Sequence, residues 1–341
     1  MKHCNIPIFV PHRGCPFDCV FCNQKHITGV LKDLDDEQIR SIIDEHLRTI
    51  PEDAEKEIAF FGGSFTGIEE SVRKRYLQLA YEYVKKGAVS GIRISTRPDY
   101  IDEHILEQLK SFGVRDIELG VQSMDKEVLA ASNRGHTPED VKKASKLIKR
   151  YGFRLGLQMM TGLPKDTPEK SLKTADEIIA LKPGCVRIYP TLVIEDTRLC
   201  EMYRAGEYAP QSLEDAVDLT AKLLEKFDKK NIPVIRVALA VTEEISPGGM
   251  YVAGPFHSAF RELCQSRIFY ERIRAAAKRD STVTAAVNPS DISKLIGNKK
   301  SNITRLKNEM NIDLIIKRDK RIKRGNIIIR DILVKENKRC I

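Results

Sequence analysis

Short runs of β-forming residues recur along the N-terminal part of the chain, and an amphipathic helical pattern follows each of them. A strand-then-helix repeat folds as a parallel sheet with right-handed crossovers. A complete eight-unit barrel takes roughly 250 residues, whereas this part of the chain holds only six units, so the pattern predicts an α/β fold with a partial (β/α)6 TIM-like barrel. The predicted strands are Ile6–Val10, Ile58–Phe61, Ile92–Ser95, Ile117–Val121, Arg154–Met160 and Val186–Tyr189.

Three cysteines follow the first predicted strand: Cys15, Cys19 and Cys22, in a C-x3-C-x2-C spacing. Three thiolates within so short a segment can hold one metal centre, and on a four-iron cluster they leave one iron open for chemistry. A zinc site with His12 or His26 as a further ligand is the alternative. No apolar h-region of a signal peptide precedes the cysteines, so disulfides are not expected.

With Phe21 just before the third cysteine, this run resembles the signature of the radical SAM superfamily. The resemblance implies a [4Fe-4S] cluster on Cys15, Cys19 and Cys22, and S-adenosylmethionine bound to its open iron. It also implies that one electron, from a reductant such as flavodoxin or ferredoxin, yields a 5′-deoxyadenosyl radical. The family's fold is a partial six-unit barrel, in agreement with the strand pattern.

Polar and glycine residues follow further predicted strands, at the end of a barrel where functional residues lie. Gly62-Gly63-Ser64 resembles the family's GGE element, which contacts the amino group of S-adenosylmethionine. Because Ser64 replaces the acid, we expect contact through backbone carbonyls or the hydroxyl. By resemblance to the oxygen-independent coproporphyrinogen oxidase and Elongator branch, the cofactor-binding set is Phe21, Gly62, Gly63, Ser64, Ser95, Gln122, Arg134 and Gln158. Ordinary loop and core hydrogen bonds are the alternative for each residue alone.

Three short segments resemble the catalytic subunit of Elongator: Thr96–Tyr100, Glu118–Ser123 and Tyr189–Ile194. That family modifies the wobble uridine of tRNA and joins a radical SAM barrel to an acetyltransferase domain that binds acetyl-CoA. The resemblance covers roughly residues 5–255. The sequence ends at Ile341 and has no long basic N-terminal extension, so we expect a short bacterial relative without an acetyl-CoA domain. Position alone suggests three substrate-side candidates, Tyr189, Glu195 and Tyr203, and none of them is assigned a catalytic role.

The positive charge lies at one end of the sequence. The whole chain has a net charge of +9, and residues 281–341 hold 15 Lys and Arg against 6 Asp and Glu, which accounts for all of it. A neutral body with a basic appendage predicts a polyanionic partner. A solvated tail without a function is the alternative.

Within the basic segment, the run Ile296–Ile303 resembles the I-G-x-x-G-x-x-I core of a KH domain. Strands are expected at Thr282–Val287, Ile312–Ile316 and Asn326–Arg330, with helices at Asp291–Leu295 and Asn302–Met310. Lys300 replaces the second glycine, so an unusual loop backbone is expected, and no helix follows Val334. A backbone-directed RNA contact is predicted through Gly297, Asn298, Lys299, Lys300, Arg318, Lys320, Arg321, Lys323 and Arg324.

The predicted organisation is a radical SAM partial barrel over residues 1–257, a linking helix over 258–280 and a small α+β KH-like domain over 281–341. The leading hypothesis is a radical SAM enzyme that modifies RNA, with tRNA as the expected substrate and the wobble uridine as a candidate target. One alternative is a radical SAM oxidoreductase of a small or tetrapyrrole substrate. Another is an RNA-binding protein with a structural or sensing cluster. No run is apolar enough for a membrane span, and a cytoplasmic location is expected.

Overall fold

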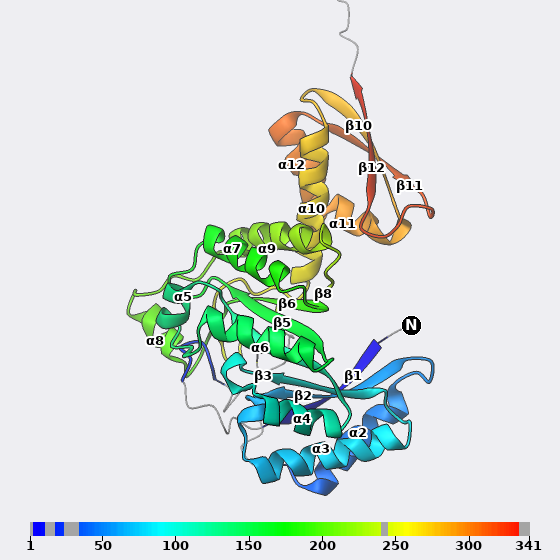
Figure 1. Cartoon of the computed structure of the whole chain (residues 1–341). Coiled ribbons are helices and arrows are strands. Elements are labelled where there is room, and N and C mark those ends of the chain that lie inside the picture. The colour runs from blue at the N-terminus through cyan, green and yellow to red at the C-terminus, as the bar shows by residue number, and fades with distance from the viewer. Residues whose placement is uncertain (1–2, 11–17, 24–33, 240–244, 334–341) are drawn as a thin grey trace, which may run out of the picture. The chain divides into compact units, whose positions relative to one another are not determined.

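The computed structural model describes residues 3–10, 18–23, 34–239 and 245–333 (Figure 1). The chain divides into two compact units, each considered by itself. The first comprises Met1–Ser212 and Lys226–Phe256, and the second comprises Leu213–Glu225 and His257–Ile341. None of the described helices combines the length and apolar character that a membrane span requires.

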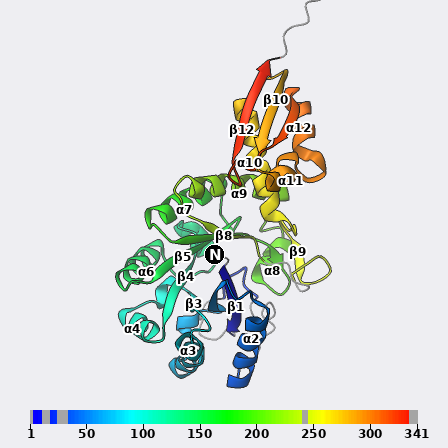
Figure 2. The ribbon, with the colours of Figure 1, turned by 90° about the vertical axis from the view of Figure 1, so that its right-hand side faces the viewer.

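A curled sheet of parallel strands forms the first unit, in the order β1-β2-β3-β4-β5-β6-β8. Consecutive strands pair in register from one edge to the other, as in Ile8 with Phe60 and Phe60 with Ile94. Figure 2 shows the sheet curving with its helices on the outside. The strands are β1 His3–Val10, β2 Glu55–Gly62, β3 Gly91–Thr96, β4 Val114–Gln122, β5 Arg154–Thr161, β6 Cys185–Pro190 and β8 Val234–Val237.

The helices of this unit begin where the sequence provides side-chain caps. Asp35 and Thr137 both form capping boxes, with Gln38 and Asp140, and Pro138 occupies the first turn of α6; such caps satisfy the free N–H groups of a first turn. The helices are α2 Asp36–Thr49, α3 Glu70–Lys85, α4 Glu103–Ser111, α5 Lys126–Ala131, α6 Pro138–Arg150, α7 Pro168–Ala180 and α8 Arg198–Arg204, with α9 Leu213–Asp228 at the division between the units and short 3-10 turns η1 Phe65–Gly67 and η2 Pro98–Tyr100.

The six predicted strands are confirmed, each within an observed strand, and the α/β half-barrel is the observed fold. The sheet has seven strands, because β8 also pairs with β6. The sequence did not single out β8, which is four residues long and exposes both Ile235 and Arg236. A two-stranded ribbon of β7 (Val193–Ile194) and β9 (Tyr251–Ala253) adds to this unit.

The inward face of the half-barrel carries a buried network of ion pairs. Arg93 on β3 lies at its centre. Its guanidinium contacts Glu57 Oε2 at 3.0 Å, Asp116 Oδ1 at 3.1 Å and Glu118 Oε1 at 2.7 Å. Arg154 completes the group by pairing with both Glu57 and Asp116. The network therefore joins β2, β3, β4 and β5 across the inside of the sheet.

Charge compensation decides the protonation of these carboxyl groups. Burial alone would raise the pKa of Glu57, but the charge of Arg93 and hydrogen bonds hold it below its ordinary value. Burial and the neighbouring Glu57 raise the pKa of Asp116 to about 6, against the opposing effect of Arg93. Removing the central cation would therefore leave three buried carboxyl groups with only Arg154 and Arg187 as arginine partners.

The second unit packs a three-stranded sheet against helices. Its order is β11-β10-β12, with β10 parallel to β11 and antiparallel to β12. Alternate residues of β10, among them Val283, Ala285 and Val287, are buried against α10 and α12 residues such as Phe269 and Leu306. Its elements are α10 Phe260–Ala276, β10 Ser281–Val287, η3 Pro289–Asp291, α11 Ile292–Ile296, η4 Asn298–Lys300, α12 Ser301–Met310, β11 Asp313–Arg318 and β12 Ile327–Leu333.

These elements confirm the strands and helices predicted for the basic segment. The KH-like assignment and the three domain boundaries stay predictions. The expectation that no helix follows Val334 lies outside the described residues.

The buried network predicts a large effect of replacing Arg93. An Arg93→Met variant should lose about 3–5 kcal/mol of unfolding free energy, because three buried carboxyl groups lose their shared partner. Urea unfolding followed by circular dichroism measures this. Arg115→Met on β4 is the matched control, since Arg115 is about half exposed and lies 4.0 Å from Glu55, and it should cost under about 1 kcal/mol. Equal losses of unfolding free energy in the two variants would contradict the role of Arg93 as the shared partner of the buried carboxyl groups.

Candidate active site

A cavity of about 500 Å³ lies at the carboxyl ends of the parallel strands. Residues of β1 through β6, of β8 and of the segment after β8 contribute to it. All eight residues of the predicted cofactor-binding set line this cavity, together with two of the three predicted cluster ligands, whereas Cys15 lies outside the described residues. The residues concerned are Phe21, Gly62, Gly63, Ser64, Ser95, Gln122, Arg134 and Gln158, with Cys19 and Cys22.

Backbone hydrogen bonds hold the described part of the cysteine loop, residues 18–23. Val20 N–H donates to Ser132 O at 3.1 Å, in the turn after α5, and Leu199 N–H at the start of α8 donates to Val20 O at 2.7 Å. The Asn23 side chain donates to Glu195 O at 2.7 Å. Segments more than 100 residues away in the sequence thus fix this loop at the cavity.

Arg134 joins the cysteine loop to β4. Its Nη1 contacts Cys19 Sγ at 3.6 Å and its Nη2 donates to Gly120 O at 2.9 Å. Its Nε is a buried donor without a hydrogen-bond partner in the described part of the chain. A buried cation against sulfur suits a thiolate ligand, and an unsatisfied buried donor suits a ligand with an acceptor atom. The residues present therefore fit a thiolate-held cluster with a polar co-ligand beside it.

Two glutamines form the wall next to Arg134. Gln122 Nε2 donates to Gln158 Oε1 at 3.2 Å, and Gln158 Nε2 donates back to Gln122 Oε1 at 2.8 Å. Gln122 has a φ of 63°, an uncommon left-handed value for a residue with a side chain. The sheet register shifts at this point between β4 and β5. The irregular end of β4 thus places a rigid amide pair on the cavity.

The hydrogen bonds of Ser64 leave its hydroxyl oxygen only the role of an acceptor toward the cavity. Thr66 donates its single hydroxyl hydrogen to Tyr100 O at 2.7 Å, so the 2.6 Å bond between Thr66 and Thr96 is donated by Thr96. Ser64 then donates to Thr96 at 2.8 Å and accepts Arg97 N–H at 3.3 Å. Its remaining lone pair makes Ser64 an acceptor toward the cavity. This polarity suits an ammonium or N–H donor.

Sequence reasoning missed the charged floor of the cavity. Glu118 and Arg187 both line it, and Arg187 Nε lies 2.8 Å from Glu118 Oε2. The Arg187 guanidinium lies 5.0 Å from the ring centre of Phe61, so β6 and β2 side chains meet across the interior. Charged residues at every second position of neighbouring strands were the available signal, since alternate residues of a strand share one face.

The three substrate-side candidates suggested by position alone lie in different surroundings. Tyr189 lines the cavity and its hydroxyl accepts from Arg187 at 3.3 Å. The Glu195 carboxylate pairs with Arg204 at 2.6 Å. Tyr203 is exposed on α8. Of these, only Tyr189 lines the cavity.

Comparison with known proteins decides what kind of domain this is. The family model described as radical SAM superfamily matches residues 9–178, and the model of the radical SAM C-terminal domain matches residues 183–270. This chain carries a radical SAM domain.

Curated relatives narrow the family further. A tRNA uridine(34) acetyltransferase of Methanocaldococcus jannaschii is 42% identical over 129 residues, covering 37% of this chain and 24% of the relative. Elongator complex protein 3 of Homo sapiens is 31% identical over 245 residues, covering 66% of this chain and 44% of the relative. The chain thus spans less than half the length of these relatives.

Solved structures support the fold. The archaeal Methanocaldococcus infernus Elp3 with an N-terminal deletion aligns with a TM-score of 0.62 at 24% identity, covering 81% of this chain and 64% of that one. Streptococcus suis SuiB bound to S-adenosylmethionine aligns with a TM-score of 0.50 at 15% identity, covering 69% and 50%. At these identities the likeness shows the fold of the radical SAM domain alone.

In the second unit, the predicted Gly297–Lys300 loop adopts a left-handed backbone. Gly297, Lys299 and Lys300 have φ values of 81°, 49° and 63°. Gly297 is buried, and a Cβ there would lie 2.4 Å from Ser301 Oγ. Lys300 therefore adopts a conformation that glycine adopts more readily. The three polar side chains after Gly297 are exposed.

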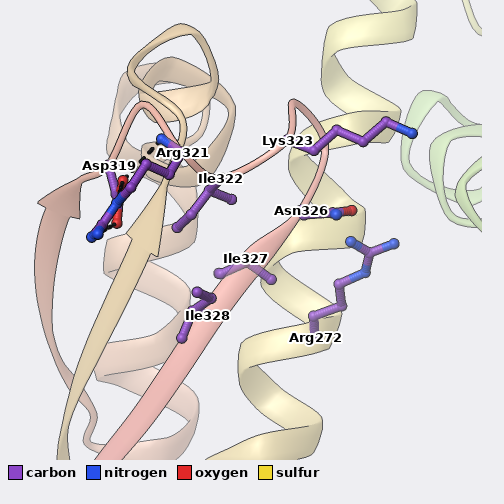
Figure 3. A pocket seen from close by; sticks show the side chains of 8 residues that line it. All are labelled: Arg272, Asp319, Arg321, Ile322, Lys323, Asn326, Ile327 and Ile328. Carbon is purple, nitrogen blue, oxygen red and sulfur yellow. Dashed lines mark hydrogen bonds and ion pairs between the residues drawn. The ribbon is translucent and has the colours of Figure 1, made fainter.

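The turn between β11 and β12 exposes the other predicted RNA contacts: Arg318, Lys320, Arg321, Lys323 and Arg324. Arg272 on α10 and Asp291 hold this turn, through Arg272 Nη1 to Gly325 O at 2.8 Å and Gly325 N–H to Asp291 Oδ2 at 2.7 Å. Two of the five, Arg321 and Lys323, also line a pocket of about 680 Å³ with Arg272 and three isoleucines (Figure 3). Residues of the Gly297–Lys300 loop do not line that pocket.

The close packing at Gly120 gives a test of the site. A Cβ at this position would lie 2.8 Å from Arg134 Nη2 and 3.0 Å from Gln122 Nε2. Gly120→Ala should therefore displace Arg134 from Cys19 and lower S-adenosylmethionine affinity about tenfold or more, measured by equilibrium binding to the anaerobically reconstituted protein. Gly184→Ala is the matched control, because a Cβ at Gly184 would lie at an ordinary contact distance of 3.6 Å from Leu155 O. Unchanged affinity in Gly120→Ala would argue against the placement of Arg134.

Proposed function

We propose that this chain is a radical SAM enzyme that modifies RNA, with tRNA as its substrate and the wobble uridine as its target. It would hold a [4Fe-4S] cluster on Cys15, Cys19 and Cys22 and bind S-adenosylmethionine in the cavity. The observation that carries the proposal is that the predicted cofactor-binding residues, far apart in the sequence, line one cavity beside Cys19 and Cys22.

The chain's own residues would bind and orient the cofactor. When bound, the cluster and S-adenosylmethionine supply a 5′-deoxyadenosyl radical once an electron arrives from a reductant such as flavodoxin or ferredoxin. Ser64 accepts an N–H of the amino group, beside the backbone of Gly62 and Gly63. The free Nε of Arg134 donates to an acceptor such as the carboxylate.

The named activity of a relative and the charge distribution support RNA as the substrate. The name of the Methanocaldococcus jannaschii relative states that it acts on uridine 34 of tRNA. In the present chain the excess positive charge falls in residues 281–341, where exposed lysines and arginines surround two turns of the second unit. Such side chains supply the phosphate contacts that dominate RNA affinity.

The first experiment separates this proposal from the two alternatives. Anaerobically reconstituted, reduced protein should form 5′-deoxyadenosine, and bulk tRNA should raise the rate severalfold. The product is quantified by chromatography, with a Cys19→Ala/Cys22→Ala variant as the blank. A rate of 5′-deoxyadenosine formation that does not change with tRNA would support a small-molecule substrate. No formation, with iron content confirmed, would support an RNA-binding protein with a structural or sensing cluster.

Neutralising the exposed loop lysines tests the role of the second unit. Lys299→Gln/Lys300→Gln should weaken tRNA binding and lower the slope of log Kd against log salt by about 1–2, because each phosphate contact contributes about one unit. Filter binding at several salt concentrations measures both. Lys143→Gln/Lys146→Gln on α6 is the control, since it removes the same charge from exposed positions of the first unit. Equal slopes in the two variants would exclude these lysines as phosphate contacts.

A further inference from the structure

The cavity is bounded by both edge strands of the half-barrel. β1 and β8 end the strand order of the sheet and do not pair with each other in the described residues. Pro7 and Phe9 on β1 line the cavity, as do Arg236 on β8 and Leu239 just after it. Phe9, Arg236 and Leu239 are also exposed. Solvent-exposed side chains on both edge strands therefore line the cavity.

The arginines that line the cavity differ in how their charges are compensated. Arg97 pairs with Asp99 at 2.8 Å, Arg187 pairs with Glu118, and Arg134 faces Cys19. Among the described residues, no side-chain hydrogen bond or ion pair involves Arg236.

Arg236 stands directly beside a second cation. It is the register partner of Arg187 on the neighbouring strand β6, and like charges at adjacent strand positions repel one another. The carboxylate of Glu118 pairs with Arg187 and with Arg93, and no ion pair joins it to Arg236. Arg236 therefore has no anionic partner among the described residues, and an anionic substrate group would supply one.

Phe9 provides an aromatic surface at the opposite edge. It is 43% exposed, although it is the register partner of the cavity-lining Phe61. An exposed aromatic ring on a cavity is a platform on which an unstacked base can lie. An enzyme that alters a base must first take it out of its stack, so a base and its phosphate arrive together.

We propose that Phe9 and Arg236 hold the target nucleotide, with its base against the Phe9 ring and its phosphate against the Arg236 guanidinium. The inference rests on the proposed function, because it requires an RNA substrate. Phe9 and Arg236, on the edge strands β1 and β8, would together bind one nucleotide at the cavity.

The test compares four variants of the full, cluster-loaded chain, with bulk tRNA as the probe. Arg236→Gln and Phe9→Leu should each lower the stimulation of 5′-deoxyadenosine formation by tRNA, expressed as the ratio of rates with and without tRNA, about tenfold. Arg236→Lys and Phe9→Tyr should retain most of it, because they keep the charge and the ring. Filter binding should show that Arg236→Gln lowers the salt slope by about 1.

One control variant and three contrary outcomes complete the test. Arg48→Gln removes an exposed arginine from α2, away from the cavity, and should leave the ratio unchanged. Stimulation and salt slope of Arg236→Gln equal to those of Arg48→Gln would overturn the inference while the proposed function stands. Absence of any tRNA stimulation in the unaltered protein would overturn both. Loss of stimulation in Arg236→Lys as complete as in Arg236→Gln would also contradict a phosphate contact.

Discussion

The buried guanidinium of Arg93 is the interaction on which the interior of the half-barrel depends. It compensates three carboxylates from β2 and β4 at once. Charged groups are stable away from water only when they are paired and hydrogen-bonded. The charged floor of the cavity can therefore form only when β2, β3 and β4 keep their observed register. The same contacts thus also fix the strand ends around the cavity.

The floor and the cavity share residues. Glu118 takes part in the ion-pair network through Arg93 and also compensates Arg187, which lines the cavity and covers the Phe61 ring. A change in the floor would thus alter both the electrostatics and the shape of the site above it. The network keeps the charge of Arg187 compensated, whereas the side chain of Arg236 has no such partner among the described residues.

The sequence was sufficient to predict the repeated strands, because buried parallel strands are short apolar runs and helices with marked caps separate them. It also predicted that cysteine, glycine and glutamine positions at strand ends would converge. It was insufficient for β8, whose exposed Ile235 and Arg236 lack the pattern of a buried strand. It could not give the donor direction at Ser64, which depends on Thr66, Thr96 and Tyr100 meeting in space. Nor could it show that Lys299 and Lys300 both adopt a left-handed backbone, which is uncommon for residues with a side chain.

The hydrogen bond from Leu199 N–H to Val20 O has a consequence for the order in which the protein matures. During synthesis the cysteine loop leaves the ribosome early, whereas the start of α8 follows only after nearly 180 further residues. Until then the loop lacks one of the contacts that give it its shape. The loop around Cys19 and Cys22 can therefore reach its final shape only after most of the half-barrel has been made.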